Sequence, residues 1–149
     1  MVSLTMIKLL PTQIPQFWEL IKFVIVNLAE ISNLELPIYI NKVLFLLLNG
    51  KGQCWIKYDD NHIVTNLHLT KLVIDTFTGE KRLELCGTYA FKFTENVIWN
   101  EMINVINDFA KKENCSIICG ESKNKRVLDM VYNYGFKEKS VSFYKKIGE

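Results

Sequence analysis

The period of the apolar residues changes along this chain, and that change restricts the possible fold more than any single motif. In the first third, apolar side chains recur at spacings of three and four, which predicts a helix over residues 14–32. A second helix is predicted over 37–48, because it opens with a proline and closes at Asn49-Gly50, a pair that tolerates positive φ. A short strand over 5–10 is predicted to precede both. The stripe of the first helix consists of Ile14, Trp18, Ile21, Ile25 and Leu28.

In the middle third the period falls to two, which is typical of half-buried strands. Strands are predicted over 53–58, 63–75 and 81–89. Turn-forming residues fill both intervals between them, at 59–61 and at 76–79. Two short turns that join three strands predict an antiparallel meander.

The last third alternates between the two periods. Its predicted elements are a helix over 96–113, a short apolar strand of the buried parallel kind over 116–119, a helix over 123–134, and two closing strands over 136–139 and 141–147. The full order, β-α-α-β-β-β-α-β-α-β-β, is that of an α/β (α+β) fold with a mixed sheet. No linker, repeat or low-complexity stretch interrupts it, so residues 1–149 are predicted to form a single domain.

Composition and charge exclude several classes of function. A chain that is 49% apolar and 23% charged suits a packed core rather than disorder, and a net charge of +2 is too small for a nucleic-acid binder. The longest apolar run, 43–48, falls far short of the ~20 residues of a membrane helix. No signal peptide is visible, which predicts an intracellular, soluble protein. Four cysteines without a CxxC pair or a nearby histidine predict buried free thiols rather than a metal site.

The closing third carries motifs of a known family. Asn-Lys-Arg-Val-Leu at 124–128, Tyr-Asn-Tyr-Gly-Phe-Lys at 132–137 and Val-Ser-Phe-Tyr-Lys-Lys at 141–146 resemble the closing helix, Gly-Phe turn and final strand of GNAT (acetyl-CoA-dependent N-acetyltransferase) proteins. The chain is more particularly similar to phage-encoded GNAT-like proteins, which share an Ile-Pro-x-x-Trp opening (14–18), a leucine-to-tryptophan segment (47–55) and a cysteine before a short strand (Cys115). The resemblance covers nearly the full length and implies a GNAT-like fold and a phage source.

One segment departs from that family. GNAT enzymes hold the pyrophosphate of acetyl-CoA with a glycine-containing loop, whose backbone N–H groups approach the phosphates at a helix N-terminus. The corresponding residues 87–96 contain no glycine after Gly87, which is interpreted as a bulge or strand-end residue, and Glu95 adds a negative charge near the helix start. The expectation is therefore a degenerate loop and no cofactor. If acetyl-CoA binds, Lys92 and Thr94 are the candidate cofactor-binding residues.

The acid and the base of GNAT enzymes are also poorly matched. Many such enzymes place a tyrosine four residues before the glycine of Gly-Phe, to protonate the leaving thiolate, and a valine stands there in this chain. Tyr132 lies about 100° away around the helix and is the candidate acid, or it only packs at the helix end. Glu84 is the candidate base, or it pairs with Arg82 or Lys71 across the meander. His68 is a further candidate base, or a histidine on a strand face.

Two main functions of different classes follow. The degenerate loop and the phage resemblance predict a non-catalytic virion component of the head-to-tail or portal-vertex region, present in the host cytoplasm and then in the virion. Its partners would be phage structural proteins or copies of itself, without direct contact with nucleic acid or membrane and without a metal. A host-factor inhibitor is a related possibility. The alternative is an acetyl-CoA-dependent N-acetyltransferase that acts on an amine, with Glu84 or a water as base and Tyr132 as acid.

The apolar excess of the first two helices favours an interaction surface. Large apolar side chains occur on more than one side of each helix, which is more than a core on one side requires. The alternative is that both helices lie deep inside the fold. The side chains that cannot all face inward are Leu20, Phe23, Tyr39 and Phe45.

Overall fold

A five-stranded sheet organises the chain, as seen in a computed structural model that describes residues 6–29 and 32–148. The strands lie in the order β1-β2-β3-β4-β5, antiparallel except for the parallel pair β4 and β5. The predicted antiparallel meander is therefore confirmed as β2, β3 and β4. The elements are β1 (Met6–Lys8), a 3-10 turn (Pro11–Gln13), α1 (Ile14–Leu28), α2 (Leu36–Leu48), β2 (Gly52–Tyr58), β3 (Val64–Ile74), β4 (Lys81–Ala90), α3 (Asn96–Lys112), β5 (Ile117–Gly120) and α4 (Lys125–Asn133).

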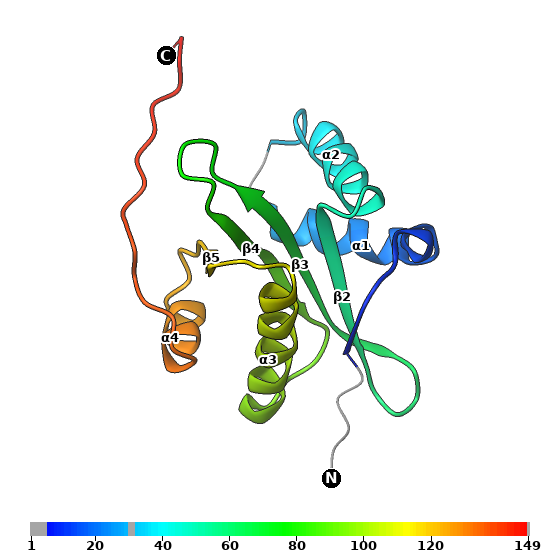
Figure 1. The fold of residues 1–149 in the computed structure, drawn as a ribbon. Helices are drawn as coiled ribbons and strands as arrows, with labels where there is room; N and C mark the ends of the chain where they lie inside the picture. Colours follow the sequence, from blue (N-terminus) through cyan, green and yellow to red (C-terminus); the bar gives the residue numbers. More distant parts are fainter. Residues whose placement is uncertain (1–5, 30–31, 149) are drawn as a thin grey trace.

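Helices cover both faces of the sheet (Figure 1). Because successive side chains of a strand point to opposite faces, β2 places Cys54 and Ile56 on the α1 side and Trp55 on the α3 side. Ile21 and Val24 of α1 are fully buried on the first face, and Met102 of α3 is 1% exposed on the second. Two apolar layers result, which is why the strands of the meander are buried on both sides.

Local signals set the helix ends. Pro15 and Pro37 stand in the first turns of α1 and α2, where a missing N–H has no helical acceptor to lose. The side chain of Asn124 caps α4 by accepting from the amides of Arg126 and Val127. Gly135 follows α4 with a φ of 93°, a left-handed conformation that favours glycine. The first helix ends at Leu28 instead of Ser32, and residues 30–31 lie outside the described part.

The two predicted closing strands are wrong. Residues 136–148 contain no regular secondary structure, and the segment runs away from the body of the molecule (Figure 1). An alternating pattern specifies an extended conformation, whereas a strand also requires a partner, which this segment lacks within the described chain. The fold class is unaffected, because the mixed α/β sheet is complete without this pair.

Candidate functional site

A β-bulge in β4 opens the sheet at Cys86. Leu85 and Gly87 lie opposite consecutive residues of β3, so Cys86 is the extra residue. Parallel pairing with β5 covers only Arg82 to Leu85 and stops at Gly120. From residue 86 to residue 90, the side of β4 that faces away from β3 therefore has no partner strand among the described residues. We call residues 86–90 on this side the open edge of β4.

The bulge also changes the face of the sheet toward which the odd-numbered side chains of β4 point. Leu83 and Leu85 pack in the layer under α3, whereas Tyr89 packs in the layer under α1. Gly87 faces α1 as well, because a Cβ built on it would lie 2.8 Å from Cδ1 of Leu28. In a regular strand all four residues would share one face. The sequence indicated a bulge or strand end at Gly87, and the bulge lies one residue earlier.

Backbone groups of the open edge are turned outward. The amide of Phe91 donates to the carbonyl of Thr65 at 2.8 Å, on the β3 side. Hydrogen-bonded pairs in an antiparallel ladder recur at every second residue. Tyr89 therefore pairs with β3, and the N–H and C=O groups of Thr88 and Ala90 point to the open edge. A ligand that contains amide groups could form hydrogen bonds with these outward N–H and C=O groups.

The open edge leads to the beginning of α3. Glu95 is the N-cap residue, but no side chain caps the amides of the first turn. These amides carry the positive end of the helix dipole. The hydroxyl of Tyr134 donates to the carbonyl of Asn96 at 3.2 Å, which joins the end of α4 to the start of α3, and burial raises the pKa of Tyr134. Sequence reasoning missed Tyr134, although its position directly before Gly135 was visible.

The two predicted cofactor-binding residues contact the meander, on the side of β4 opposite to the open edge. Lys92 forms an ion pair with Asp59 at 3.6 Å, in the turn between β2 and β3. The hydroxyl of Thr94 accepts from the side-chain amide of Asn66, a residue of β3 that is 1% exposed, at 3.0 Å. These contacts hold the loop between β4 and α3 against β3, and they place both side chains with the meander. Asn66 was not recognised from the sequence.

The candidate acid and base do not lie together in one cluster of contacts. Glu84 bonds Nε of Arg82 at 3.1 Å and Nζ of Lys71 at 3.3 Å, so the cross-strand pairing considered from the sequence is present. Tyr132 lies on α4 and is 42% exposed. Whether either residue takes part in proton transfer stays a prediction.

His68 is buried in a polar row under α3. Its Nδ1 lies 3.1 Å from the hydroxyl of Thr88, its Nε2 lies 3.2 Å from Sδ of Met102, and its ring meets Trp99 edge-on. Burial lowers the pKa of His68 to about 4. The lowered pKa favours a neutral imidazole at neutral pH, packed between β3 and α3. Whether His68 acts as a base stays a prediction.

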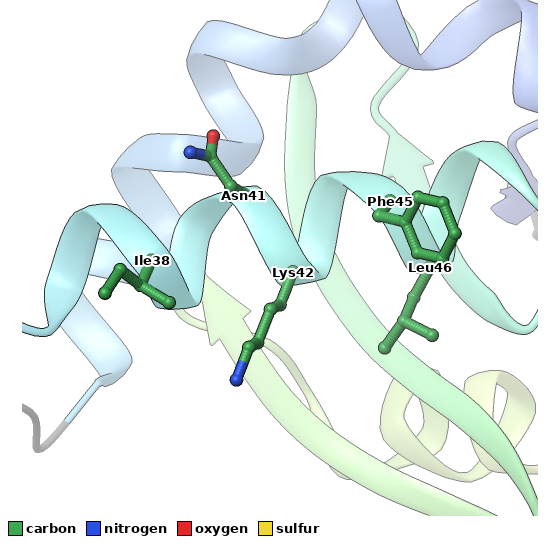
Figure 2. A pocket seen from close by; sticks show the side chains of 5 residues that line it. All are labelled: Ile38, Asn41, Lys42, Phe45 and Leu46. Carbon is green, nitrogen blue, oxygen red and sulfur yellow. The ribbon is translucent and has the colours of Figure 1, made fainter.

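The first two helices do expose apolar side chains, as predicted. Phe23, Tyr39 and Phe45 are 48%, 37% and 67% exposed, which confirms that they do not all face inward. One side of α2 forms a shallow open surface, and Figure 2 shows Lys42 and Leu46 pointing to the same side of the helix. The remaining residues of this surface are Ile38, Asn41 and Phe45.

An aromatic cluster connects α1 to the end of β4. The ring of Phe23 lies 5.8 Å from that of Tyr89 and 6.2 Å from that of Phe91. Tyr89 and Phe91 are 4.9 Å apart in turn. Sequence reasoning treated Phe91 only as a departure from a phosphate loop, and it missed this packing role because Phe23 is distant in sequence.

The remaining expectations concern cysteines, metals and membranes. Cys54 is fully buried as predicted, but Cys86, the extra residue of the bulge, is exposed, and Cys115 and Cys119 are only half-buried. Among residues 6–29 and 32–148, no group of three or more histidine, cysteine or acidic side chains is arranged to hold a metal ion. In the same part of the chain, no helix combines the length and apolar character that crossing a membrane requires.

Comparison with known proteins identifies the fold. No protein-family model and no curated protein matches the sequence. Among solved structures, a predicted acetyltransferase with acetyl-CoA from Clostridium acetobutylicum is 18% identical with a TM-score of 0.71, over 97% of this chain and 97% of the other. An aminoglycoside acetyltransferase in complex with sisomicin, from an uncultured soil metagenomic sample, is 13% identical with a TM-score of 0.70, over 97% and 96%. The ribosomal-protein-alanine N-acetyltransferase of Brucella melitensis is 13% identical with a TM-score of 0.68, over 97% and 99%.

These likenesses confirm the predicted GNAT-like fold. They also correct the expected function: a virion component of the head-to-tail or portal-vertex region is wrong, because the structures that share the fold over nearly the whole chain are acetyltransferases. The expected phage source finds no support among them. The expected absence of a cofactor has no support either. The structure from Clostridium acetobutylicum holds acetyl-CoA, and that of a further similar protein, an aminoglycoside N-acetyltransferase, holds CoA.

Proposed function

We propose that this chain is an acetyl-CoA-dependent N-acetyltransferase that acts on an amine. The observation that carries the proposal is the open edge of β4, which begins at the bulge of Cys86 and runs to the uncapped start of α3. Full-length likeness to acetyltransferase structures supports the same function. Fold alone does not decide function, so the proposal depends on this site.

The backbone groups of the site suit the cofactor. Outward N–H and C=O groups of Thr88 and Ala90 match the amides of a pantetheine arm, and the first-turn amides of α3 suit a pyrophosphate. Gly120 forms the last pair between β5 and β4, opposite Leu85. The lack of a side chain at Gly120 permits this close approach, because a Cβ on it would lie 3.3 Å from the carbonyl oxygen of Leu85. When bound, acetyl-CoA supplies an activated thioester. Glu95 and the lack of loop glycines restrict the approach of phosphate but remove none of these donors.

The chain itself would position the reactants rather than supply strong acid–base chemistry. Glu84 is the candidate base, and its two carboxylate oxygens are engaged in ion pairs with Lys71 and with Arg82. The candidate acids are Tyr132, which is half exposed on α4, and Tyr134, whose hydroxyl lies at the start of α3. Replacing each tyrosine singly by Phe separates them: loss of turnover with unchanged acetyl-CoA affinity identifies the acid.

Calorimetric titration with acetyl-CoA and with CoA tests the proposal first. We expect a dissociation constant at or below the ~1 mM limit of typical KM values. Hydrogen exchange with and without acetyl-CoA locates the site: the amides of Thr88 and Ala90 and the first-turn amides of α3 should become protected, while the turn at 59–62 should not change. A panel of amines, including an aminoglycoside and an alanine-terminated peptide, then screens for release of free CoA. Absence of heat and of protection at millimolar acetyl-CoA would refute the proposal.

A matched pair of variants tests the role of the backbone. Ala90→Pro removes an outward N–H without removing a bond to β3, whereas Ala90→Val keeps that N–H and adds similar bulk. Loss of one hydrogen bond weakens binding about 10-fold. We expect that loss for Ala90→Pro and a smaller change for Ala90→Val. Equal effects of the two variants would show that bulk matters and the edge donor does not.

A further inference from the structure

The two faces of the sheet beside the open edge of β4 differ in what covers them. On the α3 face, the hydroxyl of Thr88 contacts the buried His68, and the ring of Trp99 lies against that imidazole. On the α1 face, Gly87 has no side chain, and Cδ1 of Leu28 would lie 2.8 Å from a Cβ built there. The proposed cofactor runs from the open edge to the start of α3. The α1 face is therefore the side from which an acceptor amine reaches the thioester.

Apolar side chains line this α1 face and remain partly open to solvent. Phe23, Leu28 and Phe91 are 48%, 38% and 37% exposed. The half-buried Tyr89 meets the rings of both phenylalanines edge-on, at 5.8 Å and 4.9 Å. We call these four side chains the apolar wall. Because aromatic rings in such arrangements leave faces and edges for a further ring, the wall suits an aromatic ligand.

None of the four side chains of the apolar wall carries a charge. The stretch 86–91 is uncharged as well, and the charges of α1 are Glu19 and Lys22, which bind each other at 2.9 Å. Lys92, which follows that stretch, pairs with Asp59. An acceptor with several ammonium groups requires carboxylates that replace its bound water. The apolar wall supplies none, so it favours an acceptor whose body is uncharged.

Apolar surroundings also reduce the demand on a base. The carboxylate of Glu84 is held in ion pairs with Lys71 and Arg82, on the other side of the bulge. The nitrogen of a neutral amine forms the bond to the acetyl carbon, the carbon–sulfur bond breaks, and the proton that the nitrogen loses balances the thiolate, so that CoA leaves as the thiol. Loss of water disfavours an ammonium ion and favours the neutral amine. An amine on an apolar body therefore reaches its reactive form beside the wall more readily than one that stays hydrated.

We propose that the acceptor of this enzyme is an amine with a single positive charge and an apolar, preferably aromatic, body that packs on the apolar wall. The inference rests on the proposed acetyltransferase function and names its substrate class. Aminoglycosides carry several ammonium groups, so they are not the preferred acceptors here, although acetyltransferases that act on them share the fold.

Release of free CoA from acetyl-CoA measures the preference with a matched pair of amines. n-Pentylamine and 1,4-diaminobutane have the same number of heavy atoms, and a second ammonium group of the diamine replaces a methyl group. We expect kcat/KM for n-pentylamine to be at least ~10-fold higher, and a further increase for 2-phenylethylamine. A higher value for 1,4-diaminobutane or for an aminoglycoside would overturn the inference and leave the acetyltransferase function standing.

Variants of Phe23 show whether the apolar wall makes this selection. Phe23→Glu adds a carboxylate and should raise kcat/KM for 1,4-diaminobutane relative to n-pentylamine at least ~10-fold, whereas Phe23→Leu should keep the original order. Phe45→Glu adds the same charge on α2, where Phe45 is 67% exposed, and should leave the ratio unchanged. The dissociation constant of acetyl-CoA should be the same in all three variants. Equal shifts in the two Glu variants would show that net charge, and not the wall, sets the preference.

Saturation-transfer NMR without acetyl-CoA separates this inference from the proposed function. 2-Phenylethylamine should bind the full chain in preference to 1,4-diaminobutane, and Phe23→Glu should reverse that order. This result would support the apolar wall as an amine site even if calorimetry showed no binding of acetyl-CoA. Equal binding of the two amines, or a preference that Phe23→Glu leaves unchanged, would refute the inference whatever the cofactor does.

Discussion

His68 should make the stability of this protein fall as the pH falls below neutral. The imidazole is 5% exposed, with Thr88 and Met102 at its two ring nitrogens and Trp99 against its ring. Burial lowers its pKa from 6.5 to about 4. In the unfolded chain the imidazole binds a proton near pH 6.5, whereas the folded chain resists that proton until about pH 4. Protons therefore stabilise the unfolded chain within this window.

The magnitude follows from the separation of the two pKa values. One pKa unit corresponds to about 1.4 kcal/mol, so the full separation is worth about 3 kcal/mol once the pH is below 4. Between the two pKa values the slope is nearly constant, so the loss is spread evenly over the window. Between pH 7 and pH 5 the linkage relation gives a loss of roughly 2 kcal/mol from this single group.

Urea denaturation at pH 7, 6 and 5 measures the effect as a difference. His68→Gln removes the titrating group and keeps a polar side chain beside Thr88, so its stability should fall roughly 2 kcal/mol less than that of the unmodified protein between pH 7 and pH 5. Carboxylates titrate in both proteins and cancel. His62→Asn serves as the control, because His62 is exposed in a turn with a φ of 61° that asparagine tolerates. Parallel pH profiles for His68→Gln and the unmodified protein would refute the assignment.

Three further predictions concern hydrogen bonds. Asn124→Ala removes the cap of α4 and should cost about 1 kcal/mol in urea denaturation; no change would show that the helix start is not held there. Asn66→Ala frees Thr94 and should speed hydrogen exchange of residues 91–95 more than exchange of α3, and unaltered exchange would contradict the role of this bond in fixing the loop. Thr70→Val leaves the buried indole N–H of Trp55 without its acceptor at 3.0 Å and should cost about 1–3 kcal/mol, whereas a neutral result would mean that water replaces the hydroxyl.

The parts of the fold that depend on short-range patterns were predictable. The 3.6 and 2 periods, together with proline and glycine signals at helix ends, located the four helices of the described chain and the three strands of the meander, because both periods report which face of an element is buried. Residues 136–148 show the limit of that reasoning. Their alternation predicted two strands that do not form, because pairing depends on a partner that is distant in sequence and that the pattern does not specify.

The site was harder to predict because strand register determines it. A one-residue insertion at Cys86 decides that Gly87 and Tyr89 face α1, and no local propensity specifies this position. The same holds for Glu84, whose pairing with Lys71 requires that the two residues lie opposite each other across β3 and β4. The sequence supplied both alternatives for Glu84, base or ion pair, and only the register shows that the ion pair forms.

The prediction of function failed at an identifiable step. It took the missing glycines of residues 87–96 as evidence that the chain holds no cofactor. Glycine, however, affects how closely a backbone can be approached, whereas the donors themselves are backbone amides that every residue except proline provides. The open edge of β4 and the uncapped start of α3 retain those donors whatever side chains fill the loop. Loop composition therefore bears on affinity for the phosphates, and the geometry of the strand bears on whether the site exists.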